Sequence, residues 1–193
     1  MMRIRKILSL FCCMFLTIMM MVFPQMAQAE FPERPVGFVV IDNDGSVDGN
    51  AYKSWRQVVK WAYHFPHYKL VDDGLSQQLV SKNVREGIKL DKISMSALAE
   101  KSKVDVLVVA RIKEMDEIIV SGWVSHFEPE SYVRVVADAE LFVYKKDGEK
   151  FLKKKVREHE LHEMANYEKP VEIIKWELSK LVNTIENRPI IGS

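Results

Sequence analysis

The chain has 193 residues and is almost electrically neutral, with 28 lysines and arginines against 27 aspartates and glutamates. This balance lacks the clustered basic excess that is typical of nucleic-acid-binding domains, so we expect no nucleic-acid partner. The two cysteines, Cys12 and Cys13, both lie near the N-terminus.

The first 29 residues have the pattern of a secretory signal peptide. Three basic residues precede an uncharged apolar run over 7–23, and the triplet Ala27-Gln28-Ala29 follows. We therefore predict a signal peptide over 1–29 and a single α/β domain over 30–193. The domain is expected to be exported to the periplasm, the cell envelope or the medium, with no stable membrane span after cleavage. The alternative is a signal retained as an anchor, although the apolar run is short for a spanning helix.

The position of the cysteines limits the chemistry of the exported domain. Bulky Phe11 precedes Cys12, whereas a lipid-modified cysteine would follow a small residue, so we do not expect a lipoprotein. Cleavage after Ala29 removes both cysteines. The mature domain then has no disulfide, no thiolate nucleophile and no zinc–thiolate site, and its stability must come from packing.

The first half of the domain alternates between strand and helix patterns. In chain order it predicts a strand over 36–41, a helix over 51–65, a strand over 68–71, two short helices and a strand over 104–112. The run over 36–41 is continuously apolar, which is typical of a strand buried on both faces. We expect Asp73 to cap the first short helix and Ser94 to cap the second, with Ile93 packing against Leu98.

The second half predicts an antiparallel meander and a closing helix. Strands are expected over 117–123, 133–143 and 151–163, with a hairpin turn at 146–149. Apolar side chains occupy every second position over 133–143, as in a strand with one face on the core. Pro170 begins the last helix, which we expect to cover the hairpin. The fold class is therefore α/β, an α+β mixed sheet of about five strands with a parallel N-terminal part, a long antiparallel C-terminal meander and packing helices.

One segment resembles a known structural group. The passage ALAEKSKVDVLVVARI, residues 97–112, contains the end of a helix, a short turn and a V-D-x-hydrophobic run. It resembles a segment of bacterial envelope α/β interaction domains, including curli-secretion-lipoprotein-like domains, the Tol translocation protein N-terminal domain and lipoprotein activators of cell-wall synthases. Ala110 and Arg111 replace a glycine and a small or polar residue often found in that group. The resemblance implies an assembly or interaction role and brings no catalytic residues.

The stretch VVIDNDGSVDG, residues 39–49, carries the sharpest catalytic pattern. It looks like the first motif of haloacid-dehalogenase-like phosphatases, where a strand ends in D-x-D-G-T/S. That resemblance implies Asp42 as nucleophile, Asp44 as acid and base, and Ser46 at the hydroxyl position, beside a magnesium ion. The chain after Ser121 lacks the later acidic pair and the parallel crossovers that such an enzyme needs. A Mg-dependent phosphohydrolase is the alternative to a non-catalytic protein.

The same stretch also matches part of a calcium-binding loop. Asp44, Ser46 and Asp48 occupy the first three ligand positions of an EF-hand, but Trp55 stands where the bidentate glutamate belongs. The alternatives are a weak calcium-binding module and a polar turn in which Asp48 or Asn50 caps the following helix.

Two pairs of histidines have metal-like spacing, His64 with His67 and His159 with His162. In the predicted strand, His159 and His162 point to opposite faces, so they cannot bind one ion together. We interpret these histidines as surface residues and predict no metal site and no cofactor.

Two further groups of residues are candidates for a binding surface. A basic run on the predicted hairpin contains Lys145, Lys146, Lys150, Lys153, Lys154 and Lys155. It would suit anionic lipid or cell-wall polymer, and lysines protecting a solvated strand edge explain it equally well. An aromatic group contains Trp123, His126, Phe127 and Tyr132. It forms either a partner surface or packing between neighbouring strands.

These patterns lead to one functional prediction. We expect an exported, non-catalytic envelope protein that works as a protein- or surface-binding or assembly module. Its partner would be an envelope protein or a cell-surface component.

Overall fold

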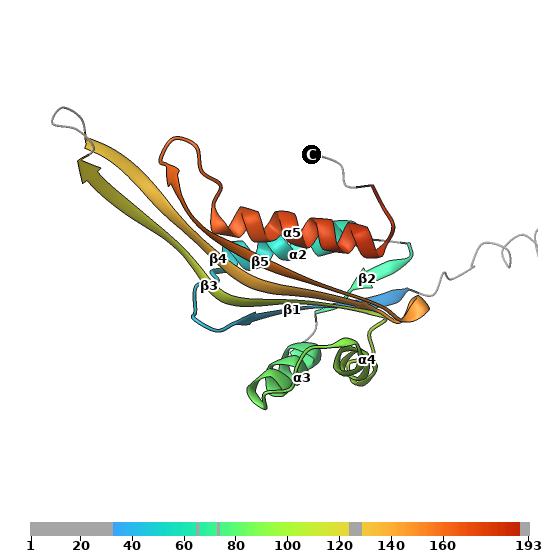
Figure 1. Ribbon diagram of the computed structural model, residues 1–193. Coiled ribbons are helices and arrows are strands. Elements are labelled where there is room, and N and C mark those ends of the chain that lie inside the picture. The colour runs from blue at the N-terminus through green and yellow to red at the C-terminus, as the bar shows by residue number, and fades with distance from the viewer. Residues whose placement is uncertain (1–32, 65, 73, 124–128, 190–193) are drawn as a thin grey trace, which may run out of the picture. The chain divides into compact units, whose positions relative to one another are not determined.

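The computed structural model describes residues 33–189, apart from 65, 73 and 124–128 (Figure 1). The predicted signal peptide, the Asp73 cap and two members of the aromatic group, His126 and Phe127, lie outside the described residues. None of the helices in the described ranges is long and apolar enough to span a membrane.

The domain is built on a five-stranded mixed sheet with the order β2-β1-β3-β4-β5. The strands are β1 (Arg34–Asp42), β2 (Tyr68–Leu70), β3 (Val106–Trp123), β4 (Pro129–Lys145) and β5 (Lys150–Glu163). β1 pairs parallel with β2 and β3, whereas β4 pairs antiparallel with β3 and β5. The predicted fold class is confirmed, including the parallel N-terminal part and the antiparallel meander.

Two pairs of helices cover opposite faces of the sheet (Figure 1). α2 (Gly49–Ala62) and α5 (Pro170–Ile185) pack on one face, and α3 (Gly74–Arg85) and α4 (Lys92–Lys101) pack on the other. Four alternate apolar residues of β4 share a core with the first pair, which explains their strict alternation: Ala137, Ala139, Leu141 and Val143. On the opposite face Phe142 and Tyr144 contact the second pair. We name these faces after their helices, the α2/α5 face and the α3/α4 face.

β3 is one long strand, so the prediction of separate strands over 104–112 and 117–123 is wrong. The pairing with β4 shifts register between Ile112 and Glu114. An extra residue at such a bulge reverses which side chains point to each face. The apolar alternation of the sequence therefore changes phase at this point, which made one strand look like two.

The start of α4 also differs from the prediction, because Asp91 and not Ser94 is the N-cap. The Asp91 carboxylate accepts a hydrogen bond from the Ser94 backbone N–H at 2.9 Å, and the Ser94 hydroxyl accepts one from the Asp91 N–H at 2.9 Å. This is a reciprocal capping box. Ile93 is 81% exposed and does not pack against Leu98.

The hairpin and the last helix form as predicted. Gly148 has a φ of 72° in the short helical turn Asp147–Glu149 that joins β4 to β5. Pro170 is at the start of α5, where its missing N–H breaks no helical bond. Ile174 and Leu178 on α5 are buried in the core against β4.

Two substitutions in α4 distinguish the buried Leu98 from the exposed Ile93. We expect Leu98→Ala to lower the free energy of unfolding by about 2–5 kcal/mol, because it removes a buried side chain. Ile93→Ala should change it by less than about 0.5 kcal/mol, because its side chain is exposed. Urea denaturation measures both; equal losses would show that Ile93 is a core residue.

Candidate functional site

The acidic residues after β1 are engaged within their own turn. The Asp42 carboxylate accepts hydrogen bonds from the backbone N–H groups of Gly45 and Val47, both at 2.9 Å. The Asp44 carboxylate accepts from the Ser46 hydroxyl at 2.7 Å. Slight burial alone would raise the pKa of Asp44, but the hydrogen bonds from Ser46 lower it below its ordinary value. These bonds stabilise a turn in which Gly45 has a φ of 78°.

Asp48 belongs to the following helix. Its carboxylate accepts a hydrogen bond from the Ala51 backbone N–H at 2.7 Å, so it is the N-cap of α2. Trp55, at the position of the missing calcium ligand, is fully buried, and its indole N–H donates to the Val171 carbonyl at 2.9 Å. The geometry of the stretch is that of a polar turn and a helix cap.

The lysines of the predicted basic patch do not share one surface. Lys145 is almost fully buried and donates to Glu186 at 2.7 Å. Lys153 pairs with Glu140 at 3.0 Å, and Lys154 pairs with Glu177 at 3.2 Å. Consecutive side chains of β5 point to opposite faces, so Lys154 lies on the α2/α5 face while Lys153 and Lys155 lie on the other. Lys146 and Lys150 are exposed at the hairpin.

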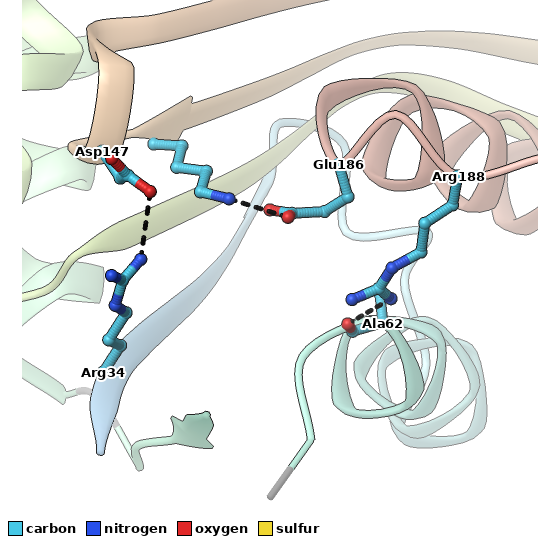
Figure 2. A network of polar contacts seen from close by, with 6 residues as sticks. Arg34, Ala62, Asp147, Glu186 and Arg188 are labelled. Carbon is cyan, nitrogen blue, oxygen red and sulfur yellow. Dashed lines mark hydrogen bonds and ion pairs between the residues drawn. The ribbon is translucent and has the colours of Figure 1, made fainter. Parts of the chain in front are cut away.

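Figure 2 shows the contacts that join the residues just after α5 to the sheet and to α2. Besides the Lys145–Glu186 pair, the Arg188 guanidinium donates to the Ala62 carbonyl at 2.6 Å. Burial alone would lower the pKa of Lys145, but hydrogen bonds with Glu186 and Tyr68 raise it above its ordinary value. Lys145 and Glu186 therefore form a charged pair in a poorly solvated place.

A second charged network lies on the α3/α4 face, centred on Glu140. Arg111, Lys113 and Lys153 each approach its carboxylate within 4 Å. Burial alone would raise the pKa of Glu140, but the hydrogen bond from Lys153 and the charges of Lys113 and Arg111 lower it. All three cations come from neighbouring strands of the sheet. Among the described residues, no helix side chain pairs with Glu140.

A groove of about 450 Å³ runs between α2 and α5. Trp61 and Trp176 lie on its two sides, and Glu172 and Arg188 are among its polar residues. Trp61 is exposed, and the ammonium of Lys180 lies 5.1 Å from the ring centre of Trp176.

The sheet continues beyond β1 as a three-stranded segment, which we call the distal ribbon: residues 114–123 of β3, 129–138 of β4 and 157–163 of β5. β1 pairs with β3 only as far as the pair of Asp42 with Ile112. Figure 1 shows β3 and β4 running on past the part of the sheet that the helices cover. One edge of the ribbon is β3, and the other is β5.

Three exposed apolar side chains share one face of the distal ribbon, whereas Ile119, which is 61% exposed, lies on the other face opposite Val133. Ile118 is opposite Arg134, which is opposite Leu161, and Val120 is opposite Tyr132. Residues directly opposite each other share a face, so these positions lie on the α3/α4 face. Ile118, Val120 and Leu161 are 42%, 41% and 57% exposed. We call Ile118, Val120, Tyr132 and Leu161 the ribbon patch.

The ribbon patch shares one residue, Tyr132, with the predicted aromatic group. Trp123 is at the end of β3, opposite Pro129. The sequence pattern predicts only a strand over 117–123 and not the exposure of Ile118 and Val120. Their exposure depends on where β1 and the helices end, which the local pattern does not record.

Comparisons with known proteins find similarity only at low identity. No protein-family model matches the chain, and no curated protein matches its sequence significantly. The hypothetical protein CT253 from Chlamydia trachomatis is 10% identical, with a TM-score of 0.43 over 83% of this chain and 99% of that one. Lipoprotein GNA1162 from Neisseria meningitidis is 12% identical, with a TM-score of 0.34 over 80% and 99%.

A third similar structure is the LpoB C-terminal domain from Salmonella enterica, which is 15% identical. Its TM-score is 0.29 over 70% of this chain and 92% of that one. The structural neighbours thus include bacterial lipoproteins. All three TM-scores lie below 0.5, so the function is argued from this chain's own residues. The resemblance to bacterial envelope interaction domains stays a prediction.

The pKa of Glu140 makes the stability depend on pH. Because the pKa is lowered on folding, the carboxylate stabilises the fold above its unfolded value, near 4.5, and this contribution disappears as the pH falls through the folded value. We expect Glu140→Gln to be less stable than the wild type at pH 7, with the difference shrinking below pH 4.5. Denaturation at several pH values measures this. The control is Glu114→Gln at an exposed position of β3, which should change the free energy of unfolding at pH 7 by less than about 0.5 kcal/mol.

The Lys145–Glu186 pair gives a second stability prediction. Lys145→Met should lower the free energy of unfolding by about 3–5 kcal/mol, because it leaves the Glu186 carboxylate poorly exposed and without its partner. The double variant Lys145→Met/Glu186→Gln should recover most of this loss. A urea-based double-mutant cycle measures the coupling; additive losses would contradict a buried charged pair.

Proposed function

We propose that the chain is an exported, non-catalytic protein of the bacterial envelope that binds another protein through the ribbon patch. The observation that carries the proposal is that Ile118, Val120 and Leu161 are exposed on one face of the distal ribbon, with Arg134 of β4 between Ile118 and Leu161. Contiguous exposed apolar side chains with polar neighbours are a common mark of a protein-binding surface. The N-terminal signal pattern supports export.

The edges of the ribbon support binding by an extended segment. Beyond Ile112, β3 has no strand on its outer side among the described residues, and β5 is likewise an outer strand. Backbone groups at such an edge are available to a partner strand. Glu114, Asp116 and Glu117 lie along the β3 edge and are exposed. Their charge would disfavour unselective pairing and favour a partner with basic residues at this position.

The acidic turn supports a non-catalytic protein. Asp42, Asp44 and Asp48 have their carboxylates occupied by backbone and hydroxyl donors of the turn and the α2 cap. Both oxygens of Asp42 accept backbone hydrogen bonds, so its use as a nucleophile would disrupt the turn. The strands after β3 are antiparallel, and the described chain does not supply the later parallel strands of a phosphatase.

Site-specific photocrosslinking in the native cell tests the binding surface. A photoreactive residue at position 118 or 161 should give one and the same envelope-protein adduct, because both positions face the same partner. Position 93 on α4 is the matched control, since Ile93 is an equally apolar and more exposed residue outside the ribbon. Ile118→Ser/Leu161→Ser should weaken binding to the captured partner at least about tenfold, with the melting temperature unchanged.

Two results would overturn the proposal. The first is an adduct from position 93 that matches those from the ribbon. The second is hydrolysis of p-nitrophenyl phosphate by the purified protein with Mg²⁺, together with loss of this activity in Asp42→Asn. That result would identify a phosphohydrolase.

A further inference from the structure

On the α2/α5 face of the distal ribbon, β5 carries a cluster of three metal-ligating side chains. Glu158, Glu160 and His162 are at alternate positions of the strand, opposite Ala137, Val135 and Val133 of β4. Alternate residues of a strand share a face. One candidate ligand atom from each of the three lies within 4.8 Å of the other two. The His162 Nε2 atom is 3.7 Å from the nearer oxygen of Glu158.

We propose that Glu158, Glu160 and His162 bind one divalent transition-metal ion, of which zinc is the best-fitting example. One imidazole nitrogen and two carboxylate oxygens form a donor set that zinc accepts. Magnesium and calcium prefer ligand sets made of oxygen alone, so the histidine selects against them. Three protein ligands leave a fourth coordination position for water or for a ligand atom from a partner.

The charges around the cluster favour a bound cation. Among the described residues, no lysine or arginine forms an ion pair with Glu158 or Glu160, and the only ion-pair partner of Glu158 is His162. By contrast, Glu140, Glu177 and Glu186 each pair with at least one lysine. Two carboxylates held close together without a basic partner repel each other. A divalent ion bound between them would remove this repulsion.

The surroundings of the cluster hold its strand in place. β5 pairs with β4 along its whole length, and the β4 residues opposite the cluster are buried. On the same face the Tyr167 hydroxyl donates to Glu117 of β3 at 3.1 Å. Glu158 and His162 are partly buried, whereas Glu160 is exposed. The three donors are therefore anchored to a paired strand and remain open to an ion from solvent.

His159 provides the matched control, because it is on the same strand but on the opposite face. It is opposite Val136 of β4, whereas His162 is opposite Val133. A histidine at position 159 therefore cannot join Glu158 and Glu160 at one ion. If zinc bound unspecifically to the exposed histidine and acidic side chains of β5, removal of either histidine would weaken binding equally.

Isothermal titration of the tag-free, chelator-stripped protein with ZnCl₂ tests the site. We expect one zinc ion per chain, and His162→Ala should weaken binding at least about tenfold, since loss of an outer-sphere contact alone costs that much. Glu160→Gln, at an exposed position, should weaken it without affecting folding. His159→Ala should leave the affinity unchanged. Thermal unfolding without metal checks that all variants fold equally well.

Three outcomes would overturn the proposal. They are no zinc binding by the wild type, equal losses from His159→Ala and His162→Ala, and calcium binding as tight as zinc binding. The proposal does not depend on the ribbon patch, which lies on the other face. Ile118→Ser/Leu161→Ser should therefore keep its zinc affinity even where it loses its protein partner, so the two ideas fail separately.

Discussion

The long antiparallel pairing of β3 with β4 is the interaction on which the rest of the structure depends. It links the parallel part of the sheet to the meander and extends beyond the last pair of β1 with β3. Because the helices cover only part of this length (Figure 1), several side chains of the outer part are exposed, although Val133, Val135 and Val136 of the central strand β4 remain buried. The distal ribbon, with its exposed patch and its free edges, follows from this mismatch in length.

The Glu140 network lies near the start of the distal ribbon, and the Lys145–Glu186 pair lies at the other end of β4, beside the hairpin. The Glu140 network and the Lys145–Glu186 pair each neutralise a poorly exposed carboxylate with a nearby cation. An unpaired charge at such a place would be strongly destabilising. In the cluster of Glu158, Glu160 and His162, an imidazole is the only ion-pair partner among the described residues, and no lysine or arginine pairs with either glutamate.

The two faces of the distal ribbon therefore differ in chemistry. One face presents Ile118, Val120 and Leu161, which suit a protein partner. The other presents two carboxylates and an imidazole, which suit a metal ion, together with the exposed Ile119. Both sets lie on strands held by continuous backbone pairing, so their spacing is set by the sheet. The two surfaces are the opposite faces of a single layer of sheet.

The order of elements, the mixed sheet and the hairpin could be predicted from the sequence, because these depend on local periodicity, on Gly148 and on Pro170. The placement of His159 and His162 on opposite faces could be predicted as well. The sequence was less informative elsewhere. It misplaced the α4 cap because Asp91 and Ser94 cap reciprocally, and it divided β3 because a bulge shifts the alternation. Only the tertiary structure decided that Ile118 and Val120 are exposed, that Lys145 is buried and that Glu158 and Glu160 meet His162. Burial and charge pairing depend on which segments end nearby, and that information is not local in the chain.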